Sequence, residues 1–286
     1  MAQPQPKATP ALEELAQAKV NLTLEVLGRR PDGYHELDSI VAFADFGDRL
    51  WLYPGEPPRV GVTGPFAREI TGDNLAARAL ALTAEAAPHF TLGRIEIDKR
   101  IPVAAGLGGG SADAAAVLRL LARANADEPI QPDWQTLALT LGSDVPAAFA
   151  SCSCRMQGRG ERLSPLPYAI DVPAVLVNPS IPVPPNKTAR VFSELSAPPL
   201  TSVPDHGVGH FASGRNDLES AASAVMPEIA QLLARLRACN GARWARLSGA
   251  GPTAFAVFDS RAQAEQAASK LSRDQSAWWV TAVTLS

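Results

Sequence analysis

The sequence predicts an α/β protein built from two domains. Its 286 residues suit two domains better than one, because single domains commonly contain about 100–200 residues. A glycine-rich loop over residues 104–110 joins a strand pattern to a helix pattern. Strand and helix patterns alternate in the second half, which is typical of helices packed on a sheet. We therefore expect one domain over residues 10–160 and another over residues 161–286.

The first hundred residues combine several strand patterns with one helix pattern. Apolar side chains from Val20 to Val26 repeat at every second residue, as in a half-buried strand. The alanine- and leucine-rich run before Pro88 has no interior glycine or proline and therefore favours a helix. In chain order we expect strands over 16–27, 37–53 and 60–62, a helix over 74–87 and a strand over 94–97, with a turn at Pro31-Asp32-Gly33 and a break at Gly47-Asp48.

The segment from Lys99 to Ala124 gives the most informative pattern of the chain. After the glycines, residues 112–124 contain only good helix formers and no breaker. Ser111 is the expected N-cap of this helix, and Asp113 in the first turn suits the positive end of the helix dipole. The sequence thus predicts a strand, a glycine-rich loop and a helix in direct succession.

The remainder of the chain continues the alternation of helices and strands. Glycine and proline clusters separate the elements, most clearly at Gly142–Pro146, at Gln157–Gly160 and after Cys239. In chain order we expect helices over 134–141, 188–195, 226–239 and 261–271, and strands over 174–177, 244–247, 253–258 and 278–284.

The bulk composition excludes several classes of protein. With 46% hydrophobic and 19% charged residues the chain resembles an ordinary globular protein, and its net charge of −3 gives no basic excess for nucleic acid or an anionic membrane. No run approaches the ~20 apolar residues of a membrane-spanning helix. The start of the chain lacks a secretory signal, and the three cysteines form no disulfide framework. We therefore expect a cytoplasmic protein with reduced thiols.

The glycine-rich loop has the properties of a phosphate site. Glycines allow a close approach of the backbone to an anion, and the following helix offers N–H groups and a partial positive charge. The loop lacks the lysine that would follow the last glycine in a G-x-x-x-x-G-K-[ST] loop. It also has Ser111 where a dinucleotide fingerprint requires its third glycine, and no early βαβ unit surrounds it. Taken alone, the loop could equally be a flexible turn.

Further motifs, in their order along the chain, resemble those of the GHMP kinase superfamily. The matching stretches cover residues 18–258 and read AKVNLTLEVLGRRPDGYHELDS, IPVAAGLGGGSADAAAVL, LGSDVPAAF, GRNDLE and RLSGAGPTAFAVF. The resemblance implies a ribosomal-protein-S5-like first domain, a ferredoxin-like second domain and an ATP-dependent phosphorylation of an alcohol. The pairing of Lys-Val-Asn with Asp-Gly-Tyr-His is similar to the branch whose acceptor is a cytidine-diphosphate-linked methylerythritol of the non-mevalonate isoprenoid route.

The resemblance implies catalytic roles for Lys19 and Asp144. Asp144 would accept the proton of the acceptor hydroxyl, while the ammonium of Lys19 would keep that carboxylate ionised and favour the developing alkoxide. Such a pair suits phosphoryl transfer, which depends on positioning and charge stabilisation. Without the resemblance, Asp144 would be read as a helix N-cap and Lys19 as a solvated residue of an edge strand.

The resemblance also implies the nucleotide site. ATP with Mg²⁺ would bind at Asn74 near the adenine, where a plain helix N-cap is an equal alternative, and Ser111 is a candidate ligand of the metal ion. The residues expected around the phosphates are Pro102, Val103, Ala104, Ala105, Gly106, Leu107, Gly108, Gly109, Gly110, Ser111 and Ala112. The Ser248–Pro252 loop is expected to brace the phosphate loop.

For the acceptor, the resemblance implies a pocket that recognises the cytosine. Tyr34 would stack on the pyrimidine and His35 would bind its polar edge. The other expected pocket residues are Asn21, Lys99, Thr188 and Phe192, of which Phe192 could instead be a core residue. The alternatives are a related kinase acting on homoserine, mevalonate or a sugar, and a non-catalytic nucleotide-binding protein of the same fold. The only expected partner is the small-molecule acceptor, and the chain is expected to be a monomer or a weak homodimer.

Overall fold

The computed structural model describes residues 12–202 and 209–286. They form two compact units, neither of which is continuous in sequence. The first unit contains the chain up to Ala16, Gly47–Val103 and Gly110–Phe149, and the second contains Gln17–Phe46, Ala104–Gly109 and Ala150–Ser286. The mixed content of helices and strands confirms the predicted α/β class. The single boundary at residue 160 stays a prediction.

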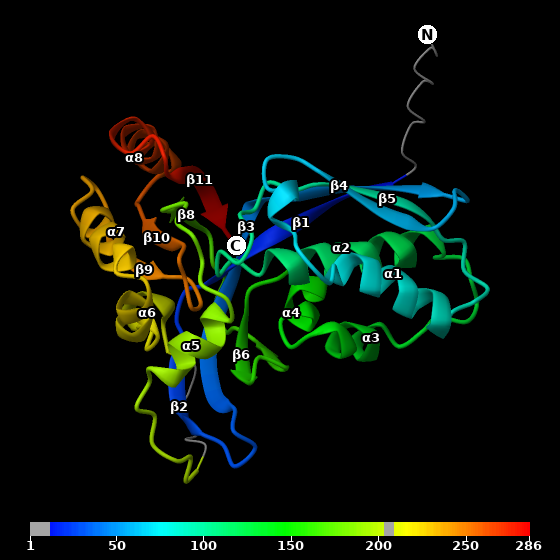
Figure 1. Ribbon diagram of the computed structural model, residues 1–286, viewed down its shortest axis with the longest axis horizontal. Helices are drawn as coiled ribbons and strands as arrows, with labels where there is room; N and C mark the ends of the chain where they lie inside the picture. The colour runs from blue at the N-terminus through cyan, green and yellow to red at the C-terminus, as the bar shows by residue number, and fades with distance from the viewer. Residues whose placement is uncertain (1–11, 203–208) are drawn as a thin grey trace. The chain divides into compact units, whose positions relative to one another are not determined.

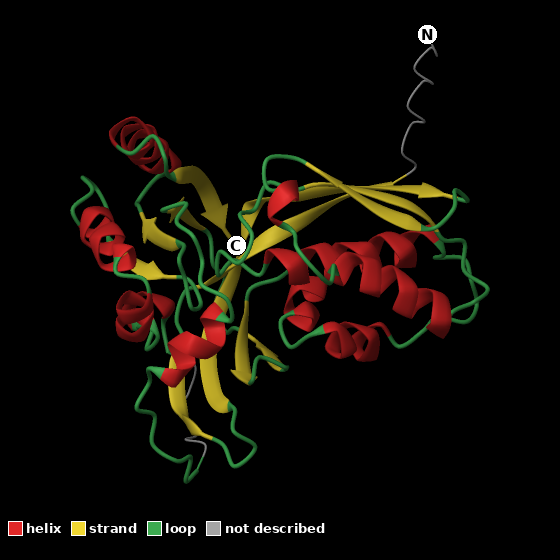
Figure 2. Ribbon diagram, in the orientation of Figure 1, coloured by secondary structure: helices red, strands yellow, loops and turns green. Residues whose placement is uncertain are grey.

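The first unit packs helices against one side of a small sheet (Figures 1 and 2). Ile95 and Ile97 alternate with half-buried residues along one strand and are at most 1% exposed, so one face of this sheet belongs to the core. Helix α2 (Gly109–Ala124) buries most of its alanines and leucines, and Ala114 and Leu118 are fully buried. Its elements are β4 (Arg59–Thr63), η1 (Ala67–Glu69), α1 (Leu75–Ala86), β5 (Gly93–Asp98), α2 (Gly109–Ala124), α3 (Trp134–Leu141) and α4 (Val145–Ala150), and β5 pairs parallel with β4 and antiparallel with the end of β3 (His35–Pro54).

The second unit is built on an antiparallel sheet in the strand order β9–β10–β8–β11–β3. Helix α7 packs on β9 and β10, and α8 packs on β8 and β11. Fully buried apolar residues such as Val177, Ile229 and Leu247 form the core between these helices and the sheet. The elements are β8 (Val172–Asn178), α5 (Lys187–Ser193), η2 (Phe211–Ser213), α6 (Glu219–Val225), α7 (Glu228–Arg237), β9 (Trp244–Leu247), β10 (Ala254–Val257), α8 (Arg261–Asp274) and β11 (Trp279–Leu285).

Two hairpins complete the second unit. Strand β2 (Glu25–Arg29) pairs with the start of β3, which also pairs with β6 (Cys154–Gly158). Strand β6 in turn pairs with β7 (Arg162–Pro165) through the predicted glycine turn. The long strand β1 (Leu12–Asn21) pairs with β3 as well.

Two expectations about the elements were wrong. Strand β3 runs without interruption through Gly47-Asp48, because the side chain of Asp48 is buried and accepts hydrogen bonds from Arg100 N at 2.5 Å and Ile101 N at 2.8 Å. The strand predicted over residues 16–27 is two strands, β1 and β2. The helix predicted over residues 226–239 is present as α7 (Glu228–Arg237), and the separate helix α6 precedes it.

Ser111 is not the N-cap of the helix that follows the phosphate loop. Helix α2 begins at Gly109, directly after Gly108 with its left-handed φ of 65°, so Ser111 lies within the first turn. Asp113 is buried and pairs with Lys99 instead of facing the solvent at the helix terminus. Within the described residues, no helix combines the length and the apolar character needed to cross a membrane.

Candidate active site

The phosphate loop has the backbone geometry of an anion-binding loop. Ala104, Gly106 and Gly108 adopt left-handed conformations with φ of 54°, 82° and 65°. A side chain at Gly106 would place its Cβ 2.5 Å from the carbonyl oxygen of Ser248, so this position requires glycine. Because helix α2 starts at Gly109, its first unpaired N–H groups follow the loop directly. Together these features favour binding of a phosphate group.

The Ser248–Pro252 loop braces the phosphate loop, as the sequence predicted. The hydroxyl of Ser248 donates to Gly106 O at 2.9 Å, and Thr253 N donates to Ala105 O at 3.0 Å. The hydroxyl of Ser248 also accepts from Asn21 N at 3.3 Å, which ties the end of β1 to the same place. All the residues that form these bonds belong to the second unit.

Lys19 lies against the phosphate loop within the second unit. Its side chain is 5% exposed, which excludes the alternative of a solvated surface lysine. Its backbone N–H donates to Leu107 O at 2.9 Å, and its aliphatic chain passes within about 3.5 Å of the Cβ position of Gly108. Asp144 lies in the first unit, between α3 and α4, where its carbonyl accepts from Ala148 N at 3.1 Å. The catalytic roles of these two residues stay predictions.

Asn74 is the N-cap of α1, one of its two expected roles. Its side-chain oxygen accepts from Ala76 N at 2.9 Å. Its side-chain NH₂ group stays a candidate for binding the adenine, because the helix cap uses only the side-chain oxygen. Ser111 is half-buried in the first turn of α2.

Two of the expected pocket residues contact each other. The ring of His35 stacks on that of Phe192 with 4.9 Å between centroids and 24° between planes. Phe192 also borders the apolar core of the second unit, as its alternative role predicts, and its role in the pocket stays a prediction. Burial, and then the positive charge of Arg29, lower the pKa of His35. A neutral imidazole offers one donor and one acceptor, the combination needed for the polar edge of a base.

Thr188 and Tyr34 have exposed side chains in the same unit. Thr188 lies one turn before Phe192 on α5, so both share a helix face. Tyr34 is 57% exposed at the tip of the β2–β3 hairpin, and the guanidinium of Arg159 lies 4.8 Å from the centroid of its ring. One face of the Tyr34 ring therefore carries a cation, which the sequence did not indicate.

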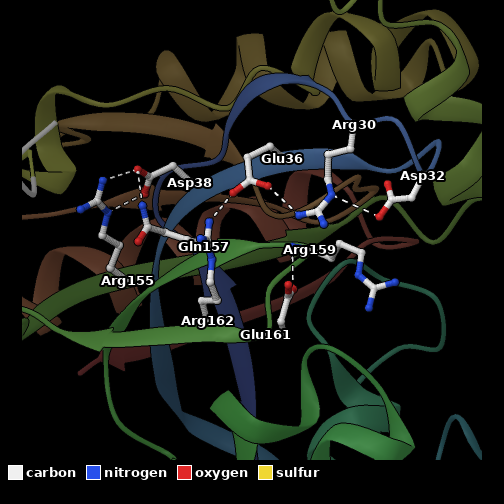
Figure 3. A network of polar contacts seen from close by, with 9 residues as sticks. All are labelled: Arg30, Asp32, Glu36, Asp38, Arg155, Gln157, Arg159, Glu161 and Arg162. Atoms are coloured by element: carbon white, nitrogen blue, oxygen red, sulfur yellow. Dashed lines mark hydrogen bonds and ion pairs between the residues drawn. The ribbon is translucent and has the colours of Figure 1, made fainter. Parts of the chain in front are cut away.

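A polar network holds the two hairpins that carry Tyr34 and Arg159 (Figure 3). The carboxylate of Glu36 is 2% exposed and accepts from Arg30 at 2.8 Å and from Arg162. Beside it Asp38 accepts two bonds from Arg155. The Asp38–Arg155 pair is bidentate and mostly buried, and such a pair fixes geometry better than a single surface pair does.

Lys99, an expected pocket residue, is buried between two carboxylates of the first unit. Its ammonium is 2.6 Å from Asp48 and 2.5 Å from Asp113. Burial raises the pKa of Asp113 well above its ordinary value, against the opposing effect of Lys99. The other oxygen of Asp113 is buried without a hydrogen-bond partner among the described residues. A role of Lys99 at the acceptor stays a prediction.

Sequence reasoning missed two cations of the second unit. Arg159 occupies a Gly-Arg-Gly turn, a pattern that favours a hairpin and carries no signal for an aromatic partner. Lys187 follows Pro-Pro-Asn at the start of α5 and binds carbonyl oxygens of both glycine-rich loops. Its partners are 83 and 64 positions away in the chain, beyond the reach of any local pattern.

Comparison with known proteins yields similar sequences and similar structures. The family model for the GHMP kinases N terminal domain matches residues 74–151, and that for GHMP kinases C terminal matches residues 207–276. The chain is 45% identical to a 4-diphosphocytidyl-2-C-methyl-D-erythritol kinase of Bradyrhizobium sp., over 96% of this chain and 97% of the relative. It is 46% identical to the enzyme of the same name from Bradyrhizobium diazoefficiens, over 97% and 99%.

Among solved structures, the chain resembles a 4-(cytidine 5'-diphospho)-2C-methyl-D-erythritol kinase with a TM-score of 0.80 and 39% identity, over 96% of this chain and 99% of the other. A homoserine kinase from Cytophaga hutchinsonii is similar with a TM-score of 0.65 and 14% identity, over 99% and 98%. At that identity the second likeness concerns the fold alone.

Proposed function

Because the chain belongs to the 4-diphosphocytidyl-2-C-methyl-D-erythritol kinases of the GHMP kinase superfamily, we propose that it transfers the γ-phosphoryl group of ATP to the 2-hydroxyl of that cytidine diphosphate compound. The chain is thus an ATP-dependent phosphotransferase of the non-mevalonate isoprenoid route. We place its activity in the cytoplasm.

One observation supports this function most: the stack of His35 on Phe192, with the exposed ring of Tyr34 at the preceding position of the chain. Aromatic side chains that offer a ring face, next to a neutral imidazole, suit a pyrimidine base. Homoserine, mevalonate and sugars lack such a base. The phosphate loop would serve any of these acceptors and so does not discriminate between them.

In the proposed mechanism the protein positions two anionic molecules and stabilises the charge that develops between them. The carboxylate of Asp144 accepts the proton of the 2-hydroxyl as its oxygen bonds to phosphorus. The ammonium of Lys19 stabilises the developing negative charge, and the N–H groups of the loop and of α2 hold the phosphates. Asn74 contributes its amide to the adenine, and Asn21 and Thr188 line the acceptor pocket.

The backbone N–H groups of the phosphate loop suit the phosphates of ATP. A magnesium ion would bind together with the nucleotide. Within residues 12–202 and 209–286, histidine, cysteine, aspartate and glutamate form no group of three that could hold a metal by themselves. Mg²⁺ in kinases is commonly held by substrate phosphates with few protein ligands. The hydroxyl of Ser111 is the candidate protein ligand, and the ion would neutralise phosphate charge.

The direct test of the function is ADP release with Mg·ATP and a panel of acceptors. We expect turnover with the cytidine diphosphate compound and none with homoserine, mevalonate or galactose. Turnover with another member of the panel would retain the kinase and remove the cytosine pocket. Nucleotide binding without turnover of any acceptor would favour a non-catalytic protein.

Replacement of Tyr34 by alanine is expected to raise the KM for the acceptor. Loss of one base–aromatic stack costs about 1–3 kcal/mol, which corresponds to roughly 5- to 150-fold in KM. The KM for ATP should stay nearly constant, since Tyr34 lies at the tip of a hairpin and the phosphate loop contacts other residues. The measurement is a pair of KM determinations at saturating co-substrate.

The matched control is Tyr34→Phe, which retains the ring and loses only the hydroxyl. Its KM for the acceptor should stay within about threefold of the wild-type value, because stacking needs the ring face alone. An unchanged acceptor KM in Tyr34→Ala would remove this residue from the pocket.

A further inference from the structure

Lys187 is a buried cation that joins the phosphate loop to the loop that braces it. Its side chain is 7% exposed at the first position of α5. Its ammonium donates to Ala104 O at 3.0 Å and to Gly251 O. All three residues belong to the second unit, so these contacts lie within one compact body.

The first of these contacts holds a residue in an unfavourable conformation. Ala104 has a φ of 54°, in the left-handed region that residues with a Cβ avoid. A hydrogen bond from a charged donor to its carbonyl stabilises that peptide orientation. With the carbonyl of Ala104 turned to Lys187, the shape of the following loop is fixed at its start.

The charge of Lys187 is uncompensated by acidic groups nearby. The two loops that it joins, residues 104–109 and 248–253, contain no charged side chain. Among the described residues, no carboxylate forms an ion pair with it, and Glu219 on the adjacent helix α6 pairs with Arg237. On the same element, Arg190 lies within α5 and Glu194 follows its last residue. Lys19 is a further cation beside the phosphate loop. An anion on the loop would therefore meet the field of Lys187 with little screening.

We propose that Lys187 is a positioning residue for ATP, whose charged ammonium holds the phosphate loop in its binding shape and attracts the triphosphate. The inference rests on the proposed function in one respect, namely that the nucleotide binds at this loop. Nothing in it depends on the identity of the acceptor.

Protonation of Lys187 makes nucleotide binding depend on pH. Burial lowers the pKa of Lys187 to about 8, so in the free protein the ammonium loses its proton between pH 7 and pH 9. An anion on the loop favours the protonated form, so nucleotide binding takes up a proton in this range. ATP affinity should consequently fall as the pH rises.

The experiment is calorimetric titration with the non-hydrolysable ATP analogue AMP-PNP and Mg²⁺, without acceptor, at pH 7, 8 and 9. For the wild-type protein we expect Kd to rise about tenfold from pH 7 to pH 9, because the protonated fraction of a group with a pKa of about 8 falls about tenfold. Lys187→Met should bind about tenfold more weakly at pH 7, with little further change up to pH 9. Lys270→Met, which alters an exposed lysine of α8, is the control and should show the wild-type profile.

A purely structural role of Lys187 would weaken binding at every pH and leave the slope with pH unchanged. The same slope in Lys187→Met and in the wild-type protein would therefore overturn the proposal, as would a wild-type Kd that is constant from pH 7 to pH 9. If Lys187→Met does not fold, Lys187→Arg replaces it. Its guanidinium keeps its charge at pH 9, so its Kd should stay constant with pH, and a wild-type slope in this variant would contradict the proposal.

Failure of the proposed function is recognised separately. If the wild-type protein binds AMP-PNP but phosphorylates no cytidine diphosphate acceptor, the function is wrong and the titrations still decide the role of Lys187. If it phosphorylates the acceptor and Lys187→Met binds the nucleotide as the wild-type protein does, only the inference about Lys187 is wrong.

Discussion

Replacement of Asp144 by asparagine is expected to lower kcat by about 10²- to 10⁴-fold, the usual contribution of a positioned general base. Asparagine keeps the size of the side chain and cannot accept the proton of the acceptor hydroxyl. Binding of the ATP analogue should change little, since the charge that is removed is negative. The measurements are single-turnover phosphorylation with saturating acceptor and a calorimetric titration of the nucleotide.

The matched control for Asp144→Asn is Asp133→Asn, in the same unit. Asp133 caps α3 through bonds of 3.0 Å to Gln135 N and Thr136 N, and asparagine is an equally good N-cap. This variant should retain the wild-type kcat. Turnover close to the wild-type rate in Asp144→Asn would show that another group accepts the proton.

Replacement of Lys99 by methionine is expected to destabilise the protein by about 3–5 kcal/mol, because removing one partner of a buried ion pair leaves uncompensated charge. Lys99 is 3% exposed, and its ammonium contacts Asp48 and Asp113, which are also buried. Urea-induced unfolding at pH 7 measures the loss. A stable Lys99→Met protein with a raised KM for the acceptor would instead support the pocket role expected from the sequence.

Two further variants isolate the effect of burial on the ion pairs of Lys99 with Asp48 and Asp113. Arg49→Met removes an ion pair with Glu13 in which both side chains are about half exposed, and should cost less than about 1 kcal/mol. Asp113→Asn should be at least as stable as the wild-type protein at pH 7. Because burial raises the pKa of Asp113, its favourable contribution is complete below about pH 4 and is lost as the pH rises through the folded-state pKa. Asparagine resembles the protonated acid and cannot undergo that loss.

The sequence predicted the elements best where the determining signals are local. Helix α3 agrees with the prediction to the residue, since the side chain of Asp133 caps its start and Gly142 ends it. The strands β9 and β4 and the helix α8 were also found from periodicity and flanking turns. The contact between the glycine-rich loop and the Ser248–Pro252 loop was expected from the resemblance to the GHMP kinases.

The errors occurred where distant contacts override a local signal. Gly47-Asp48 is a typical turn sequence, yet the strand continues, because Asp48 is bound by the backbone and by Lys99 about fifty residues later. Asp113 would lie in the first turn of a helix that begins at Ala112, yet α2 begins at Gly109 and the partner of Asp113 is Lys99 in the preceding loop. The stack of His35 on Phe192 joins residues from a hairpin and from α5, and only the resemblance to a family could bring the two together.

Strand β11 has a consequence for the order in which the second unit can form during synthesis. It lies between β8 and β3, with Ser286 exchanging two 2.9 Å backbone hydrogen bonds with Phe43, and Thr284 N reaching Asp45 across 239 positions of the chain. A growing polypeptide that has left the ribosome up to β10 would still expose one edge of β8 and one edge of β3. Unpaired strand edges associate readily with other chains. Insertion of β11 would thus be the step that pairs both of these edges.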